Sequence, residues 1–447
     1  MKLRILLLFA LILPLTGLAD NALVKTYTLD NGLKLYVKEV HRAPVVFSSI
    51  WYKVGSGNEP NGLTGISHML EHMMFLGSRN YAAGILDQLV NENGGSQNAM
   101  TTNDYTVYYQ FMPADKLDLV LKLEADRMQN LLIDDQQFQN ERKVVMQERR
   151  MRVDNNPQSL LYERLNAAAF VNNPYHHLPI GWMTDIKHYT LHDLQKWYET
   201  WYVPNNAFIV VVGDVNSDQV YQSVNRYFSN IAAQKLPNLK PRTEIPRLGS
   251  KTVNVFANAK MPAVFLAFNM PTLVTKKNSP TPYALDILSG ILCGDNSSRL
   301  QKALILTQRV ANDVECSYSP LYLHENLFYI YAVPNPPYTI QDVLNSLAVE
   351  LTKIQTTLVS PDELNRVKTT VKAQKIYERD TLQAQAFAIG VPESLNLSWR
   401  ISENYSKAID KITAEDLQNA AKTWIKPENS TIGVLNPLPK KSNQGTQ

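Results

Sequence analysis

Residues 61–77 have the sequence NGLTGISHMLEHMMFLG, which is the most informative stretch of the 447-residue chain. Its mostly apolar composition predicts a buried helix that Gly77 ends as a C-cap. His68 and His72 are four residues apart and share one face of this helix, and Glu71 lies on the same face. Two imidazoles on adjacent turns can bind one zinc ion, and a carboxylate beside them can take a proton from water.

These three residues form the metallopeptidase motif H-E-x-x-H read in the opposite chain direction, as H-x-x-E-H. The reversal keeps the chemistry because a shared helical face, and not the chain direction, brings the side chains together. The alternative is a structural core helix that carries its histidines by chance. That alternative buries three ionisable side chains without partners, which is costly, so a metal ion is the better interpretation.

A second helix, predicted over residues 136–150, offers candidates for a third ligand, because catalytic zinc sites usually have three protein ligands. Glu141 and Glu148 are seven residues apart and lie on one face of this helix. One carboxylate can bind the metal ion while the other accepts a hydrogen bond from a ligating histidine. From spacing alone, however, a solvated helix face is the better interpretation of Glu148.

Three longer stretches make the sequence similar to a known family, namely HMLEHMMFLGS (residues 68–78), GGSQNAMTTNDYTVYYQF (residues 94–111) and NERKVVMQERRMRVDNNP (residues 140–157). They resemble the pitrilysin/insulinase family of zinc peptidases. The likeness continues through most of the chain after residue 19. The length of the chain matches the short members of that family, which have two homologous domains and work as dimers.

The resemblance implies a role for each residue of the site. It implies one Zn²⁺ per chain and these assignments: metal ligands His68, His72 and Glu148, catalytic base Glu71, and Glu141 as the hydrogen-bond partner of a ligand. It also implies that Asn98 and Ala99 lie on an edge strand beside the zinc, where a peptide substrate adds as a further strand. The alternative for Asn98 is a turn residue that follows Gly94 and Gly95.

A linker divides the chain after residue 19 into two halves of similar length. Residues 235–250 contain Pro237, Pro241 and Pro246 among scattered charges, which predicts an extended linker. We therefore expect a zinc-binding domain at 20–234 and a homologous domain at 251–447. Each half shows strands, a helix, a strand and further helices. This order predicts an α+β fold of two similar units, each a largely antiparallel sheet with helices on one face.

The first residues have the features of a targeting segment. Lys2 and Arg4 precede the apolar run ILLLFALILPL, and small residues follow, so residues 1–19 are predicted to be a signal peptide cut after Ala19. The alternative is an uncleaved anchor or a buried helix. After cleavage we expect a protein without a membrane span, exported to the periplasm or secreted. The formal net charge of +3 gives no indication of nucleic-acid binding.

Cysteine and histidine residues outside the motif leave little further chemistry. Cys293 and Cys316 form a disulfide or are two buried thiols, and the sequence does not distinguish these possibilities. His176 and His177 lie in a proline-bounded loop and are interpreted as loop residues, not ligands.

A partner chain is a further implication of the resemblance. Active family members complete the site with an Arg from the homologous second half, and the corresponding position here is matched to Phe328, with no Arg nearby. Either this match is misplaced or a partner chain supplies the Arg, and we expect a homodimer, or a heterodimer with a homologous Arg-bearing subunit, that encloses a chamber.

The function predicted from all of this is that of an exported zinc metalloendopeptidase acting on peptides or small unfolded proteins. The alternatives are a non-catalytic structural subunit and a peptide-binding protein.

Overall fold

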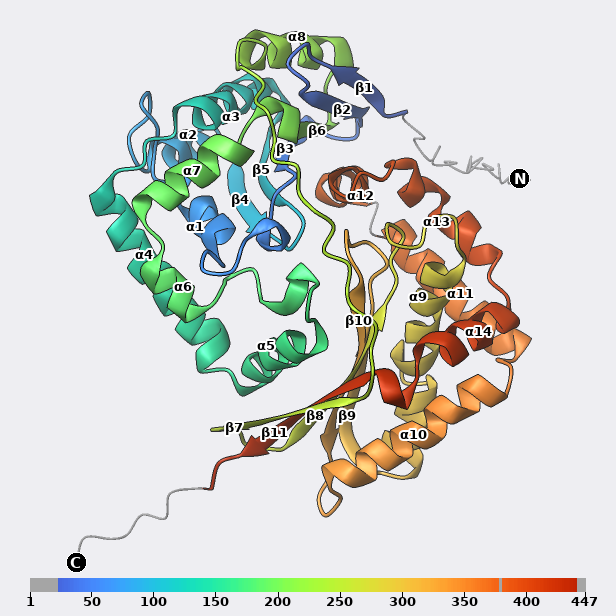
Figure 1. The fold of residues 1–447 in the computed structure, drawn as a ribbon. Coiled ribbons are helices and arrows are strands. Elements are labelled where there is room, and N and C mark those ends of the chain that lie inside the picture. Colours follow the sequence, from blue (N-terminus) through green and yellow to red (C-terminus); the bar gives the residue numbers. More distant parts are fainter. Residues whose placement is uncertain (1–22, 378–379, 440–447) are drawn as a thin grey trace, which may run out of the picture.

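The computed structural model of the protein describes residues 23–377 and 380–439, so the predicted signal peptide at 1–19 lies outside the described residues. Two sheets dominate the fold (Figure 1). The first has the strand order β1-β2-β6-β3-β5-β4 and comprises β1 (Lys25–Thr28), β2 (Lys34–Glu39), β3 (Val45–Tyr52), β4 (Ser96–Thr101), β5 (Thr106–Pro113) and β6 (Ala207–Gly213). The second has the order β7-β11-β8-β10-β9 and comprises β7 (Lys251–Ala257), β8 (Ala263–Met270), β9 (Ala311–Ser317), β10 (Asn326–Pro334) and β11 (Ser430–Pro437).

The two sheets have the same connectivity once β1 is set aside. In the first sheet β2 and β6 are parallel and the other neighbours are antiparallel. In the second sheet β7 and β11 are parallel and the other neighbours are antiparallel. The prediction of an α+β protein built from two similar, largely antiparallel units is therefore confirmed.

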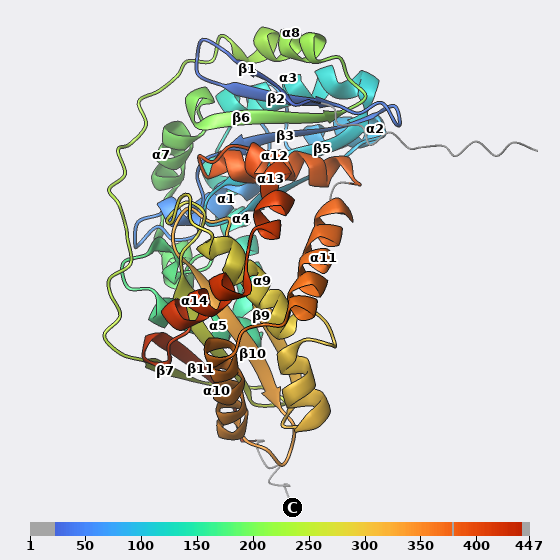
Figure 2. The same ribbon diagram turned by 90° about the vertical axis from the view of Figure 1, so that its right-hand side faces the viewer.

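Most helices lie on the outer faces of the two sheets (Figures 1 and 2). Those of the first half are α1 (Ile66–Met73), α2 (Ile85–Glu92), α3 (Leu117–Asn130), α4 (Asp135–Arg149), the π-helix η3 (Arg150–Asp154), α6 (Met183–His188), α7 (Leu191–Trp201) and α8 (Ser217–Phe228). Those of the second half are α9 (Thr281–Cys293), the π-helix η6 (Gln301–Thr307), α10 (Ile340–Thr356), α11 (Pro361–Tyr377), α13 (Arg400–Asp410) and α14 (Ala414–Trp424). Single 3-10 turns are η1 (Ser56–Asn58), η2 (Ala114–Lys116), η4 (Pro174–His176), η5 (Pro204–Asn206) and η7 (Pro427–Asn429).

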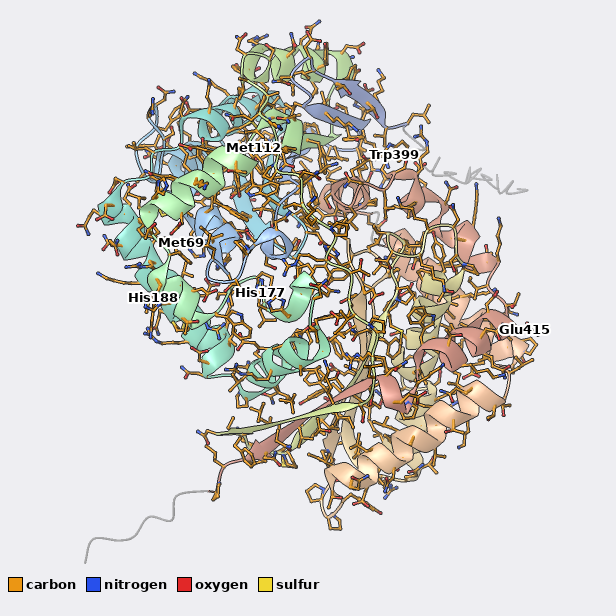
Figure 3. The ribbon with its side chains drawn as sticks, viewed as in Figure 1. Met69, Met112, His177, His188, Trp399 and Glu415 are labelled. Carbon is orange, nitrogen blue, oxygen red and sulfur yellow. A yellow bond between two sulfur atoms is a disulfide. The ribbon has the colours of Figure 1, made fainter. Side chains whose placement is uncertain are left out.

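Two further helices are exchanged between the halves and cover the inner faces. Helix α5 (Pro157–Ala169) belongs to the first half of the sequence but contacts β7, β8 and β11. Helix α12 (Leu382–Ser394) belongs to the second half but contacts β3 and β6. Trp399, which follows α12, lies in the same core as the inner face of the first sheet (Figure 3). Each sheet is therefore buried on both faces, once by its own helices and once by a helix of the other half.

The helix predicted over residues 61–77 is shorter than expected, because α1 spans only Ile66–Met73. It cannot begin earlier because Gly65 has a φ of +87°, outside the right-handed helical region. At the other end, the Phe75 N–H donates to the His72 carbonyl (3.1 Å), which tightens the chain into a three-residue turn. Gly77, with a φ of +111°, follows this turn and is not the C-cap, which is Met74.

Two further features are a disulfide within the second half and the segment that connects the two halves. Cys293 at the end of α9 and Cys316 in β9 form a disulfide, so the open question about these residues is answered in favour of the bond. Residues 235–250 contain no helix or strand and join the first sheet to the second (Figure 2).

None of the helices within the described ranges is long and apolar enough to cross a membrane.

Candidate metal centre and substrate cleft

Helix α1 is anchored at its N-terminus by two carboxylates from outside the helix. Buried Glu59 accepts hydrogen bonds from the Gly65 N–H (2.7 Å) and the Ser67 N–H (2.9 Å). Asp185 accepts from the N–H (3.1 Å) and the hydroxyl (2.7 Å) of Thr64. These carboxylates satisfy backbone donors that the helix leaves free and lie at the positive end of its dipole. The start of α1 is thereby fixed, and with it the direction of the side chains that follow.

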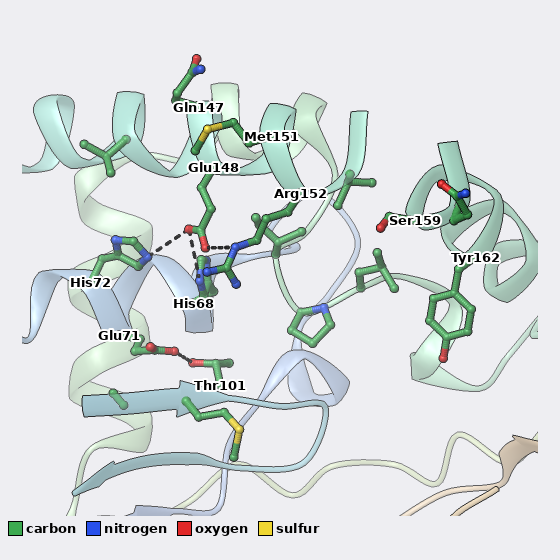
Figure 4. Close-up of a pocket in the computed structure, with 18 of the residues that line it drawn as sticks. His68, Glu71, His72, Thr101, Gln147, Glu148, Met151, Arg152, Ser159 and Tyr162 are labelled. Carbon is green, nitrogen blue, oxygen red and sulfur yellow. Dashed lines mark hydrogen bonds and ion pairs between the residues drawn. The ribbon is translucent and has the colours of Figure 1, made fainter. Parts of the chain in front are cut away.

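Two of these side chains, His68 and His72, converge with Glu148 of α4 (Figure 4). The Nε2 atom of His72 lies 3.3 Å from Glu148 Oε2, and the Nε2 atom of His68 lies 3.7 Å from the same oxygen. One ligand atom from each of His68, His72 and Glu148 lies within 4.8 Å of the others. The structure thus brings together the three residues predicted as ligands, although some 75 residues of sequence separate His72 from Glu148.

The distances and the unsatisfied atoms fit a zinc ion. Tetrahedral zinc with bonds of about 2.0–2.1 Å places its ligand atoms about 3.3 Å apart, close to the separations seen here. Glu148 Oε2 and His68 Nδ1 are buried and form no hydrogen bond within the described chain. A buried carboxylate oxygen without a donor is costly, and a cation between it and the two imidazoles removes that cost. Two nitrogen atoms and one carboxylate oxygen are also a common zinc donor set.

Glu141 lies on the far side of the His72 ring. Its Oε1 atom is 2.7 Å from His72 Nδ1, so the ring carries a proton there and turns Nε2 toward Glu148. Burial lowers the pKa of His72, but the nearby carboxylates of Glu141 and Glu148 outweigh this and raise that pKa to about 9. Burial lowers the pKa of His68 to about 4. Both carboxylates of α4 therefore act on the same imidazole, one at each nitrogen.

Glu71 points away from the three convergent atoms toward β4. The Thr101 hydroxyl donates a hydrogen bond to Glu71 Oε2. Burial raises the pKa of Glu71, and the bond from Thr101 opposes this rise only in part. We call His68, His72 and Glu148 the metal group, after the ion that they could hold. A carboxylate with a raised pKa close to this group is suited to both take up and release a proton.

Strand β4 forms one edge of the first sheet and carries Asn98 and Ala99. Ala99 is opposite Tyr108 of β5, and its N–H donates to its own neighbour, Asn98 Oδ1 (2.8 Å). This N–H therefore faces the open edge, where the Asn98 side chain takes the place of a strand partner. The prediction that these two residues lie on an edge strand, and not in a turn, agrees with this geometry.

A cleft of about 1290 Å³ runs from the metal group to the second sheet. On one side it is lined by β4 and α4, and on the other by Tyr162 of α5, Phe265 of β8 and Tyr329 of β10. Both halves of the chain therefore contribute to its walls, and the exchanged helix α5 forms the connection between them (Figure 1).

Several residues singled out in the sequence lie elsewhere. His176 and His177 are bound to oxygen atoms of Asn173, Asn61 and Leu178, away from the convergent group. Phe328 is fully buried in the core between the second sheet and its outer helices. The match of Phe328 to a substrate-facing cation is therefore wrong, because strand alternation turns its neighbour Tyr329 into the cleft instead.

Three contributors to the site were missed in the sequence. Glu59 lies six residues before Gly65, beyond the reach of a capping pattern, and only the loop geometry brings it back. Thr101 is three residues after Asn98, and strand pairing places it against Glu71. Arg152 is four residues after Glu148, a spacing that could have been recognised as a helical ion pair.

The fold and the convergent group define a class, that of two-sheet α+β proteins with a His-His-Glu group, able to hold a metal ion, at the edge of one sheet. Comparison with family models places residues 35–178 in the insulinase family (peptidase family M16) and residues 188–371 in the peptidase M16 inactive domain. The zinc protease PqqE of Helicobacter pylori is 32% identical over 421 residues, covering 92% of this chain and 93% of that protein.

Solved structures agree with this assignment. The crystal structure of a protease from Helicobacter pylori matches with a TM-score of 0.87 at 31% identity, over 93% of this chain and 100% of that one. The periplasmic protease PqqL from Escherichia coli has the same fold, with a TM-score of 0.78 at 19% identity, over 93% of this chain and 48% of that one. The chain belongs to the insulinase family, peptidase family M16, as the resemblance predicted.

Proposed function

We propose that the protein is a zinc metalloendopeptidase in which His68, His72 and Glu148 hold one zinc ion per chain. The observation that carries this proposal is the convergence of these three side chains with Glu148 Oε2 buried and without a donor. Zinc bound there would activate a water molecule and polarise the scissile carbonyl. The zinc protease name of the Helicobacter pylori relative supports the same metal and reaction.

The protein's own contribution to the reaction is proton transfer and orientation. Glu71 takes a proton from the attacking water on a carboxylate oxygen and returns it to the nitrogen of the leaving amine. Its raised pKa favours both steps, and the Thr101 hydroxyl orients its other oxygen. Glu141 keeps the His72 ring in the tautomer that leaves Nε2 free for the metal.

The substrate in this proposal is a peptide or a small unfolded protein added as a strand along β4. When such a peptide binds, Asn98 releases the Ala99 N–H, which then donates to a substrate carbonyl. Backbone pairing accepts many sequences, so selectivity comes from side chains further along the cleft. A cleft of about 1290 Å³ accommodates an extended segment and excludes a folded domain.

Export and assembly are further parts of the proposal. The signal-like segment at 1–19 and the Cys293–Cys316 disulfide both support an oxidising compartment, either the periplasm or the exterior. The fold match spans about half of the PqqL chain, which suggests that two units of this size work together. We infer that a homodimer, or a heterodimer with a homologous Arg-bearing subunit, closes the cleft into a chamber.

The test compares the wild type with Glu71→Gln, which removes the base and leaves all three metal ligands. We expect near-stoichiometric zinc in both proteins and a loss of peptide cleavage of at least about 100-fold in the variant. Glu199→Gln is a matched control, since Glu199 is an exposed residue of α7. Equal cleavage by wild type and Glu71→Gln would contradict the mechanism. Tight peptide binding without turnover, with or without a partner subunit, would instead favour a non-catalytic role.

A further inference from the structure

The charged side chains of the cleft are not balanced. Among the cleft-lining residues that the structure describes, the carboxylates are Glu71 and Glu148, and both lie at the metal group. The lysine and arginine side chains that line it are Lys143 of α4 and Arg152 of η3. A divalent metal ion bound there would offset the two carboxylates, so Lys143 and Arg152 would give the cleft a net positive charge.

Arg152 is placed to act on a bound molecule. Its Nε atom forms an ion pair with Glu148 Oε1 (2.9 Å), which fixes the guanidinium beside the metal group. The side chain is nevertheless 73% exposed, so its two terminal NH₂ groups remain open to the cleft. Figure 4 shows Arg152 between the metal group and Ser159 and Tyr162, on the side that leads toward the second sheet.

Lys143, five residues before Glu148 on α4, adds a second positive charge to the cleft. Lys143 is exposed and lines the cleft on α4. Apart from Glu71, Glu148, Arg152 and Lys143, the described lining contains no Asp, Glu, Lys or Arg. The uncharged lining beyond Arg152 includes the polar or aromatic residues Gln158, Ser159, Tyr162 and Tyr329, together with apolar residues such as Val153 and Ile180. A cationic wall of this kind attracts carboxylates and repels lysine and arginine side chains.

We propose that the enzyme selects peptides that carry an acidic group near the scissile bond, and that Arg152 binds this carboxylate through its terminal nitrogen atoms, with Lys143 contributing a weaker attraction. The inference rests on the proposed peptidase function and names the substrate class of that site. A guanidinium with a fixed Nε presents its remaining donors as a fork, which matches the geometry of a carboxylate. The acidic group lies on the side of the metal that leads toward Tyr162.

The experiment uses neutral peptides in which a single Glu is moved one residue at a time, each paired with a Gln version. For the best-placed Glu we expect kcat/KM at low salt to exceed that of the Gln peptide by about tenfold, and the ratio to fall in high salt. Arg152→Gln should reduce the ratio to below about threefold, and Lys143→Gln should reduce it less. Arg150→Gln is the matched control, because Arg150 is an exposed arginine of the same π-helix that does not line the cleft.

The ratio separates selection from a purely structural role. If Arg152 only orients Glu148, Arg152→Gln will slow the Glu and Gln peptides equally, leave their ratio unchanged and overturn the proposal. Equal rates for every Glu and Gln pair in the wild type would also overturn it, while cleavage itself would leave the peptidase function standing. If no peptide is cleaved, fluorescence anisotropy of the same pairs on zinc-loaded Glu71→Gln protein decides between selection and its absence.

Discussion

The two halves of the chain share one sheet connectivity but differ in the helix that follows the first two strands of the repeat. Helix α1 packs against α4 and β4, and α9 packs in the same way against α11 and β9. Helix α1 presents His68, Glu71 and His72 to a cleft. Helix α9 instead buries aliphatic residues, namely Ala284, Leu285, Ile287, Leu288, Ile291 and Leu292. The same framework therefore holds a candidate metal-binding group in one half and an apolar core in the other.

The partner helices differ in the same sense. Helix α4 directs Glu141 and Glu148 at His72, whereas Glu363 of α11 forms a two-bond ion pair with Arg299. A carboxylate on this helix is thus paired with a metal group in one half and with a guanidinium in the other. The sheet and its helices therefore determine where a site can form, while a few side chains determine whether it does.

The largest loss of zinc and of peptide cleavage is expected when a carboxylate of α4 is neutralised. Glu148→Gln replaces an anionic ligand with a neutral amide, so we expect loss of most of the zinc and of peptide cleavage. Glu141→Gln keeps all ligands and weakens only the support of His72, so we expect zinc affinity or activity to fall by about 10–100-fold. Zinc content after dialysis and cleavage rates measure both effects.

A carboxylate on the equivalent helix of the second half provides the control. Glu363→Gln breaks the ion pair with Arg299 on α11 and should leave zinc content unchanged. If Glu141→Gln loses the metal while Glu148→Gln keeps it, the assignment of the third ligand is reversed.

Local periodicity in the sequence was sufficient to predict most elements of both halves. Strands such as β6 and β8 are short apolar runs, and the face shared by His68, Glu71 and His72 follows from helical geometry alone. The exchange of α5 and α12 could not be predicted, because their apolar faces are equally compatible with either sheet. The role of Glu59 was missed for a related reason, since a loop and not a helical spacing brings it to α1.

The contacts of the two exchanged helices can be tested at two glycines, one on α12 and one on the strand β11 that α5 packs against. A methyl group at Gly390 of α12 would lie 2.2–2.7 Å from three ring atoms of Trp51, a fully buried side chain of β3. At Gly433 of β11 it would lie 3.2 Å from the Cδ1 atoms of Leu161 and Leu165 of α5. Leucine side chains can turn away, whereas the enclosed indole cannot.

We therefore expect Gly390→Ala to lower the free energy of unfolding by about 2–3 kcal/mol, despite the better helix propensity of alanine, and Gly433→Ala to lower it by less than about 1 kcal/mol. Urea unfolding of the two variants beside the wild type measures both values. Equal losses would show that the two exchanged contacts are similarly adaptable, contrary to their geometry.

The smallest effect is expected at a contact between the halves that depends on pH. Asp104, buried in the β4–β5 loop, accepts hydrogen bonds from the Tyr175 hydroxyl and from the Leu323 N–H (3.1 Å) of the second half. Burial raises its pKa to about 6, against an ordinary value of 3.8. The folded protein therefore binds this proton more tightly than the unfolded chain. The contribution of Asp104 to the free energy of unfolding is complete below about pH 4 and is lost as the pH rises through about 6.

Asp104→Asn cannot ionise and lacks this pH dependence. In the metal-free proteins we expect the free energy of unfolding of the wild type, relative to the variant, to increase by about 1–3 kcal/mol between pH 7 and pH 4. Urea midpoints across this range measure the difference, and Asp362→Asn, at an exposed position of α11, provides a control for general acid effects. A difference that is flat with pH would contradict the raised pKa, and one that falls on acidification would mean that the hydrogen bonds from Tyr175 and Leu323 hold the carboxylate charged. The halves would then be joined by an ionised hydrogen-bonded contact, and acidification would weaken their contact instead of strengthening it.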